Sequence, residues 1–213
     1  MKQNRHLNLG IISAIIVVAA LSRLLFVMIP NFSPIGAIAL FGAAYFSKRY
    51  LAFLIPLAAM WVSDLLINNM VYPRMFPEYY DGTFAWGVSW WVYGAFALVV
   101  MLGFLLFKRR KAAMNDSNIL DDTSLKASPR INIKNVAVAS LLTAIVFFLI
   151  TNFGVWAGGA MYPKTASGLM LCYGAAIPFF WNTLISNFIF SAVLFGGYEL
   201  LKQRYPSMIF QKA

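Results

Sequence analysis

Residues 22–46 read SRLLFVMIPNFSPIGAIALFGAAYF, and the number of membrane crossings depends on this stretch. Arg23 lies inside an apolar run that continues to Ile29, and a second, short apolar run extends from Ile35 to Phe46. At 1.5 Å of rise per residue the second run cannot cross about 30 Å of hydrocarbon, unless it begins inside the turn or lies where the protein thins the bilayer. A charge in hydrocarbon is expensive, so Arg23 is expected to face the interior of a helix bundle and to have a partner there.

The composition of the whole chain indicates an integral membrane protein. Of its 213 residues, 61% are hydrophobic and only 11% are charged, and the mean hydropathy is +0.73. A soluble domain of this size could not bury that much apolar surface, whereas lipid removes the difficulty. The net charge of +10 does not indicate a nucleic-acid partner, because most Lys and Arg residues fall in short segments between apolar runs.

The distribution of basic residues predicts an all-α membrane protein of six helices with both termini in the cytoplasm. The predicted helices form a single membrane domain over 1–213 and span about 9–29, 35–46, 51–69, 90–107, 136–153 and 175–201, with a polar cytoplasmic linker at 108–134. This arrangement places fourteen Lys and Arg residues on the inner side and only Arg74 and Lys164 on the outer side. Without the helix at 35–46, the basic cluster at 108–111 would lie outside, so the short run is expected to be a crossing.

The N-terminal stretch has a second interpretation. Lys2 and Arg5 precede an apolar run, as in a secretory signal peptide. The run continues to Ile29, however, which is long enough to span the bilayer, so a retained first helix is expected.

A polar belt near the outer face is the candidate binding site. Arg23 and Asp64 lie at similar depths in two helices that both run outward, which predicts a salt bridge, a ligand contact or both. Amide side chains close the third and fifth helices at the same level, although such amides also serve as interhelical contacts. The predicted substrate-binding residues are Arg23, Asn31, Trp61, Asp64, Asn68, Tyr79, Tyr80, Asn152, Trp156, Tyr162, Trp181 and Asn182.

Two outer segments, at 71–89 and 154–173, are rich in aromatic residues, Gly and Pro. Long loops of this kind at one membrane face can act as lids over a cavity. They can also form an aromatic belt at the lipid–water interface, and the sequence favours neither interpretation.

Several chemistries are excluded or disfavoured by the residues present. His6 is the only histidine and lies near the N-terminus, so no histidine-based triad or metal site is expected in the membrane. The chain has no Gly-Lys-Ser/Thr phosphate loop. Cys172 could ligate a metal-containing ligand but is better explained as a small packed residue. No catalytic residue, cofactor or metal is therefore predicted.

Several motifs resemble those of a known family. These are NFSPIGAIALFGA at 31–43, TNFGVW at 151–156, YPKT at 162–165 and CYGAAIPFFWNT at 172–183. They are similar to a family of uncharacterised bacterial membrane proteins (DUF6580-like) described as candidate transporters. The resemblance covers nearly all of the membrane region but implies no firm function.

At a coarser level the chain is similar to the S components of energy-coupling-factor (ECF) vitamin transporters, most of all the cobalamin type. That resemblance implies six helices, a vitamin bound near the outer face under a loop lid, and docking on a transmembrane coupling subunit with its ATPases. Asp64 in the third helix and the aromatic loop after it carry the likeness to the cobalamin type. The loop at 77–80 has no cysteine, so the likeness does not extend to thiolate ligation of cobalt.

These observations lead to one hypothesis and two alternatives. The chain is expected to be a substrate-binding transport component in the bacterial inner membrane, contacting lipid and a vitamin-like solute, with a corrinoid favoured. An integral-membrane enzyme acting on a lipid or isoprenoid is the first alternative, with Asp64 as base or metal ligand. The lack of a second intramembrane carboxylate, apart from Glu199 at the cytoplasmic end, counts against it. A non-catalytic scaffold with a structural Arg23–Asp64 pair is the second alternative.

Overall fold

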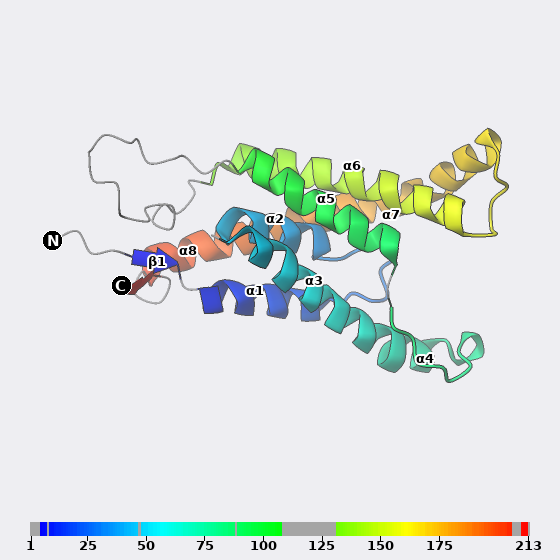
Figure 1. The fold of residues 1–213 in the computed structure, drawn as a ribbon, viewed down its shortest axis with the longest axis horizontal. Helices are drawn as coiled ribbons and strands as arrows, with labels where there is room; N and C mark the ends of the chain where they lie inside the picture. Colours follow the sequence, from blue (N-terminus) through cyan, green and yellow to red (C-terminus); the bar gives the residue numbers. More distant parts are fainter. Residues whose placement is uncertain are drawn as a thin grey trace.

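The structure is a computed structural model that describes residues 5–7, 9–46, 48–87, 89–107, 131–205 and 210–212. Helices account for most of the described chain, and the strands β1 (Arg5–Leu7) and β2 (Phe210–Lys212) form one short antiparallel pair. The principal helices are α1 (Leu9–Leu21), α2 (Ile35–Tyr45), α3 (Arg49–Leu66), α5 (Trp90–Leu106), α6 (Ile133–Gly158) and α7 (Ala166–Ser191). They form an elongated bundle (Figure 1).

The two ends of the bundle differ (Figure 1). One end, here called the terminal end, holds the β1–β2 pair and helix α8 (Gly197–Arg204). The opposite end, here called the loop end, holds the short helix α4 (Tyr72–Met75), the loop at 76–87 with its 3-10 turn at Pro77–Tyr79, and the irregular segment at 159–165. Both chain ends therefore lie at the same end of the molecule.

Helix α2 is the centre of the bundle. It contacts α1, α3, α5, α6 and α7, and almost all of its residues are buried. Small residues allow this close approach: a Cβ added at Gly103 of α5 would lie 2.6 Å from the Cβ of Ala43 in α2. Because α2 is surrounded by protein, its length need not match the thickness of a bilayer.

The first helix is shorter than the predicted 9–29. It ends at Leu21 and is followed by a 3-10 turn at Ser22–Leu24 and then by turns that continue to Pro34. The Ser22 hydroxyl donates to the carbonyl of Ala19, and such local bonding competes with the helical hydrogen-bond pattern. The segment 25–34 is therefore a loop rather than the end of a span.

The last helix is longer than the predicted 175–201, and the second outer loop is correspondingly shorter than the predicted 154–173. Helix α6 continues to Gly158, and α7 begins at Ala166, so only 159–165 is irregular. Thr165 caps α7 by accepting a hydrogen bond from the Gly168 amide at 3.2 Å. Gly168 is required there because an added Cβ would lie 2.0 Å from the Pro163 carbonyl oxygen.

The remaining predicted helices have the expected places with small changes in their ends. The third continues beyond Asn69 through a π-helical turn at Ile67–Val71 into α4, and the fifth begins at Ile133. Asn132 caps this helix, α6, by accepting a hydrogen bond from the Lys134 amide at 2.9 Å. Most of the predicted linker, 108–130, lies outside the described residues.

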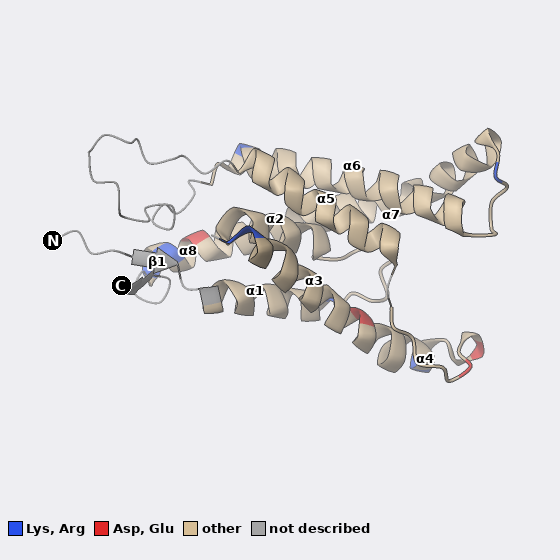
Figure 2. Cartoon of the chain, viewed as in Figure 1, with Lys and Arg blue, Asp and Glu red and all other residues tan. Residues whose placement is uncertain are grey.

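Three helical segments of the described chain are long and apolar enough to cross a membrane, namely Arg49–Met75, Ile133–Gly158 and Ala166–Arg204. The helices at Gly10–Leu24, Ile35–Tyr45 and Trp90–Leu106 are apolar but shorter. In Figure 2, several Lys and Arg positions lie toward the terminal end, and acidic and basic positions also occur along α3 and α4 toward the loop end. The described helices therefore have the composition of a membrane protein.

Candidate functional site

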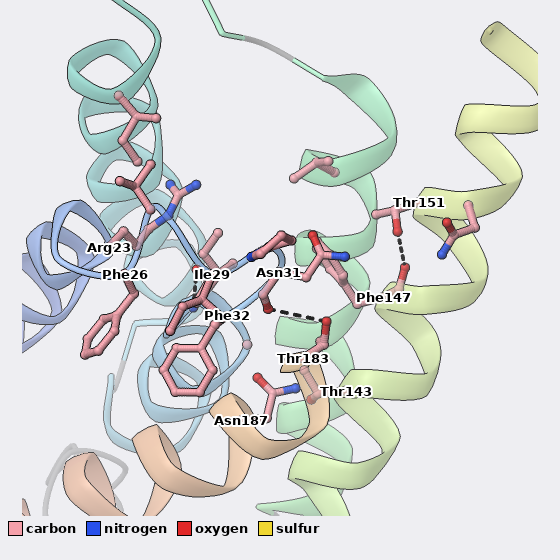
Figure 3. Close-up of a pocket in the computed structure, with 18 of the residues that line it drawn as sticks. Arg23, Phe26, Ile29, Asn31, Phe32, Thr143, Phe147, Thr151, Thr183 and Asn187 are labelled. Carbon is pink, nitrogen blue, oxygen red and sulfur yellow. Dashed lines mark hydrogen bonds between the residues drawn. The ribbon is translucent and has the colours of Figure 1, made fainter. Parts of the chain in front are cut away.

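The candidate site is a cavity of about 390 Å³ in the half of the bundle nearer the loop end. Its wall is formed by Arg23, the loop at 25–34, the start of α2, Ile67 in the π-helical turn after α3, the first residue of α4, the start of α5, and parts of α6 and α7. Figure 3 shows Arg23 on one side of this space and Thr143, Thr183 and Asn187 on the other, with Ile29, Asn31 and Phe32 between them. The volume lies at the lower end of the range for small-molecule pockets.

Arg23 lines the cavity and forms the predicted ion pair with Asp64. Arg23 Nη1 lies 2.6 Å from Asp64 Oδ1 and also donates to the hydroxyl of Ser63 at 2.7 Å. The other carboxylate oxygen of Asp64 accepts a hydrogen bond from the Tyr93 hydroxyl at 3.1 Å. Both oxygens of Asp64 are thus engaged, and Asp64 holds Arg23 in place without itself lining the cavity.

The loop at 25–34 is fastened to α7 across the cavity. Asn31 has a φ of 59°, a left-handed conformation that asparagine tolerates better than most residues, and it reverses the chain before α2. Asn182 donates to the carbonyl of Pro30 at 2.9 Å, and Thr183 donates to the carbonyl of Asn31 at 3.4 Å. The rings of Phe26 and Phe32 also pack on Phe190 of α7.

The floor of the cavity contains buried polar groups from α6 and α7. Thr143 is only 1% exposed, and its Oγ1 has no hydrogen-bond partner among the described residues. Asn187 is buried too, and its amide nitrogen reaches only one acceptor, the Ser140 carbonyl, at the long distance of 3.5 Å. Gly36 gives these side chains room, because an added Cβ would lie 2.3 Å from Asn187 Oδ1 and 2.6 Å from Thr143 Cγ2.

Arg23, Asn31 and Asn152 are the predicted site residues that line the cavity. Asp64 and Asn182 do not line the cavity but contact its wall: Asp64 pairs with Arg23, and Asn182 bonds the loop at 25–34. The cavity does not include the other predicted residues, Trp61, Asn68, Tyr79, Tyr80, Trp156, Tyr162 and Trp181.

Physical reasons explain why the aromatic predictions fall outside the cavity. Trp181 is 56% exposed on the outside of α7, and Tyr79 is 78% exposed in the loop after α4. The Trp156 indole donates to the carbonyl of Pro163, so this ring fastens the loop at 159–165 to α6. The loop at 76–87 is likewise tied back to the π-helical turn at Ile67–Val71, because Asn69 exchanges two hydrogen bonds of 2.8 Å with Ala85.

Most of the lining residues were not among the predicted site residues, and the polar ones that were missed include Thr143, Thr183 and Asn187. Asn187 was recognisable as an amide that continues the polar face of α7 inward. The sequence gives no such signal for Thr143, because a threonine inside an apolar helix usually bonds its hydroxyl to the preceding turn. Thr151 behaves in that way, donating to the Phe147 carbonyl at 2.7 Å.

The remaining reactive groups lie away from the cavity. No cluster of His, Cys, Asp and Glu that could hold a metal ion occurs within the described ranges. Cys172 is buried and its thiol faces the Asn152 carbonyl at 3.4 Å, as expected for a packed residue. In the exposed loop after α4, hydrogen bonds from Thr83 lower the pKa of Asp81.

Comparison with known families identifies the chain at the level of family. Residues 3–208 match a family of unknown function, DUF6580, so the chain belongs to that family. Comparison with curated proteins and with solved structures finds no match. The family membership agrees with the motifs at 31–43 and 151–183, and it carries no statement about ECF S components or cobalamin.

Proposed function

We propose that the protein is a membrane transport component that takes up a compact, vitamin-like solute by binding it in the cavity beside Arg23. The observation that supports this most strongly is the cavity itself. It combines one charged side chain, several amide and hydroxyl groups and an apolar wall. Such combinations are typical of small-molecule sites.

The topology proposed for this function is six crossings with both termini in the cytoplasm. The terminal end would then face inward and the loop end outward, in agreement with the basic residues near the terminal end. Helix α2 would count as a crossing although it is short, because surrounding helices shield it from lipid. The cavity would open toward the outer face, where a nutrient arrives.

The size of the cavity narrows the substrate. About 390 Å³ suits a compact solute, whereas a corrinoid with its macrocycle and nucleotide loop belongs to the upper end of the range for ligand pockets or beyond it. The corrinoid favoured by resemblance is therefore replaced in this proposal by a smaller vitamin-sized compound.

In the proposed cycle, the loop at 25–34 acts as the cover of the site. Its hydrogen bonds to Asn182 and Thr183 hold it against α7, which would exclude water from a bound solute and strengthen polar contacts. Release inward would require these helices to rearrange. That step would be driven by downhill flux or by a separate coupling subunit with ATPases, as in ECF transporters.

The lining chemistry favours binding over catalysis. Among the described residues that form the cavity, Arg23 is the only charged one, and no histidine or carboxylate lies in the wall. An enzyme acting on a lipid would need groups that move protons or hold a metal. The alternative of a scaffold is tested by the experiment below.

The test is thermal unfolding of the detergent-purified protein with a panel of water-soluble vitamins. A ligand of the folded state raises the melting temperature in proportion to the logarithm of its concentration over the dissociation constant. Val92 lines the cavity, so Val92→Phe should fill part of it and weaken binding at least tenfold. Val138 is exposed on α6 outside the cavity, and Val138→Phe serves as the matched control that retains binding. If no compound shifts the melting temperature, or if Val92→Phe binds like the wild type, the proposal is wrong.

A further inference from the structure

We infer that the solute is a small carboxylic acid whose carboxylate binds the free edge of the Arg23 guanidinium and whose far end carries a hydrogen-bonding group read by Thr143 and Asn187. This inference rests on the proposed function and names the class of substrate for the same cavity. Three features of the cavity support it: the geometry of Arg23, the distribution of charge and an unsatisfied hydroxyl.

Arg23 has donors to spare. A guanidinium carries five N–H donors in a planar fork. In the described part of the chain only Nη1 is used, for Ser63 and Asp64, while the side chain retains 16% exposure and lines the cavity. Nη2 and Nε therefore remain available as donors. Asp64 orients the guanidinium through Nη1, and the free Nη2 and Nε can bind the carboxylate of a solute.

The charge at the site favours an anion. Asp64 lies behind Arg23 and is not part of the cavity wall, and both of its oxygens already accept hydrogen bonds. A solute entering the cavity meets the cation rather than the carboxylate. An Arg–carboxylate pair is charge-assisted and often bidentate, and it strengthens when water is excluded.

At the other side of the cavity, Thr143 provides an unpartnered hydroxyl (Figure 3). Buried polar groups almost always have hydrogen-bond partners, so an orphan that is 1% exposed at a cavity wall indicates a missing group. Asn187 lies beside it with only one long hydrogen bond. A hydroxyl, amide or ring nitrogen of the solute would satisfy Thr143 and could also bond the Asn187 amide.

The wall between these two poles is mainly apolar, with Asn31 as a polar residue in it. Its apolar side chains include Phe26, Ile29 and Phe147, which Figure 3 labels. The structure thus describes a compact acid with an apolar body and a polar head, which is a narrower class than a vitamin-like solute.

The first experiment compares acids with neutral partners of the same shape. The probes are nicotinate and nicotinamide, biotin and biotinamide, lipoate and lipoamide, and pantothenate and panthenol, each added to the purified protein at pH 7.5 before thermal unfolding. At least one acid should raise the melting temperature, and its neutral partner should bind at least tenfold more weakly. Arg23→Lys retains a cation beside Asp64 but loses the planar fork, so it should unfold close to the wild-type temperature and lose at least tenfold in affinity for that acid.

The outcomes separate the two proposals. A neutral compound that binds as tightly as its acid would overturn the anion inference and leave the transport proposal standing. No shift with any probe would reject both. Inorganic phosphate and phosphatidylglycerol are included as further probes, because a shift with either would place a free or lipid phosphate at Arg23 and would overturn the assignment to a carboxylic acid.

The second experiment tests the polar head. Thr143→Val removes the unpartnered hydroxyl at nearly constant volume, so the ligand-free protein should melt at the same temperature or higher, while affinity for the identified acid falls five- to tenfold. Thr143→Ser retains the hydroxyl and should retain most of the affinity. A Thr143→Val protein that melts earlier and binds normally would show that the hydroxyl serves the fold, and the assignment of Thr143 would be wrong.

Discussion

The two halves of the bundle are built from the same helices, but the side chains of the two halves pack differently. Toward the terminal end, Phe41, Tyr45, Phe195 and Tyr198 pack with ring centroids 4.3 to 5.8 Å apart. Toward the loop end, the helices separate around the cavity lined by Arg23 and by amide and hydroxyl side chains, whereas the cavities beside the last helical turns of the terminal half have mainly apolar linings. The comparison indicates that the terminal half supplies rigidity and the loop half supplies the site, with α2 reaching from one to the other.

Removing the Arg23–Asp64 ion pair tests this division of roles between the two halves, and it has the largest expected effect on stability. The two side chains are only 16% and 13% exposed, so Asp64→Leu leaves Arg23 without its partner and should cost about 3 to 5 kcal/mol of stability. The double variant Arg23→Leu/Asp64→Leu removes both charges and should recover most of that loss. Thermal unfolding in detergent measures both. A single variant as stable as the wild type would mean that the loop half contributes little to folding.

The pair was predictable from the sequence for a physical reason. Two opposite charges at equal depth in apolar helices have few partners other than each other, so counting residues was enough. The central place of α2 was not predictable. Its short length suggested either a start inside the preceding turn or a thinned bilayer, whereas the structure shows that the other helices surround it.

The rest of the site could not be read from the pattern because the long helices are apolar on nearly every side. Without an amphipathic stripe, the sequence does not say which face of α6 or α7 points inward. Trp181 and Thr183 are two residues apart, yet the first is exposed and the second lines the cavity. The apolar run to Ile29 likewise predicted a helix where the structure has the loop at 25–34, which is hydrogen-bonded to Asn182 and Thr183.

The second-largest effect on stability is expected where α2 and α5 pack closely in the terminal half. An added Cβ at Gly103 would lie 2.6 Å from the Cβ of Ala43, so Gly103→Ala should cost about 1 to 3 kcal/mol through overpacking. Gly94 lies on the same helix with nothing near an added Cβ. Gly94→Ala should therefore be neutral or stabilise by about 0.5 kcal/mol through helix propensity. Equal melting temperatures for the two variants would show that α2 and α5 can separate at no cost.

Two buried tyrosines of the terminal half differ in their hydrogen bonding. The Tyr45 hydroxyl donates to Glu199 at 2.7 Å, whereas the Tyr198 hydroxyl has no partner within the described residues. Tyr45→Phe should cost about 1 kcal/mol, because a carboxylate loses a donor, and Tyr198→Phe should be neutral or slightly stabilising. Melting temperatures of the two variants provide the comparison. A loss confined to Tyr198→Phe would contradict this account of the terminal half.

The smallest effect is expected at Asp81, in the loop after α4. Its carboxylate accepts hydrogen bonds from the Thr83 amide at 3.0 Å and from the Thr83 hydroxyl at 2.7 Å, and these lower the pKa of Asp81. Because the folded-state pKa of Asp81 is lowered, the ionised carboxylate contributes to the free energy of unfolding above the ordinary Asp pKa of about 3.9. This contribution is lost as the pH falls through the lowered pKa. NMR titration of the Asp81 carboxyl should show the lowered pKa, and Thr83→Val should return it toward the ordinary value. Asp81 is fully exposed, so Asp81→Ala should melt like the wild type between pH 5 and pH 8. If Asp81→Ala instead destabilised the protein at pH 7 as much as Tyr45→Phe does, the loop would be part of the stabilising structure, and the division between a rigid half and a functional half would have to be redrawn.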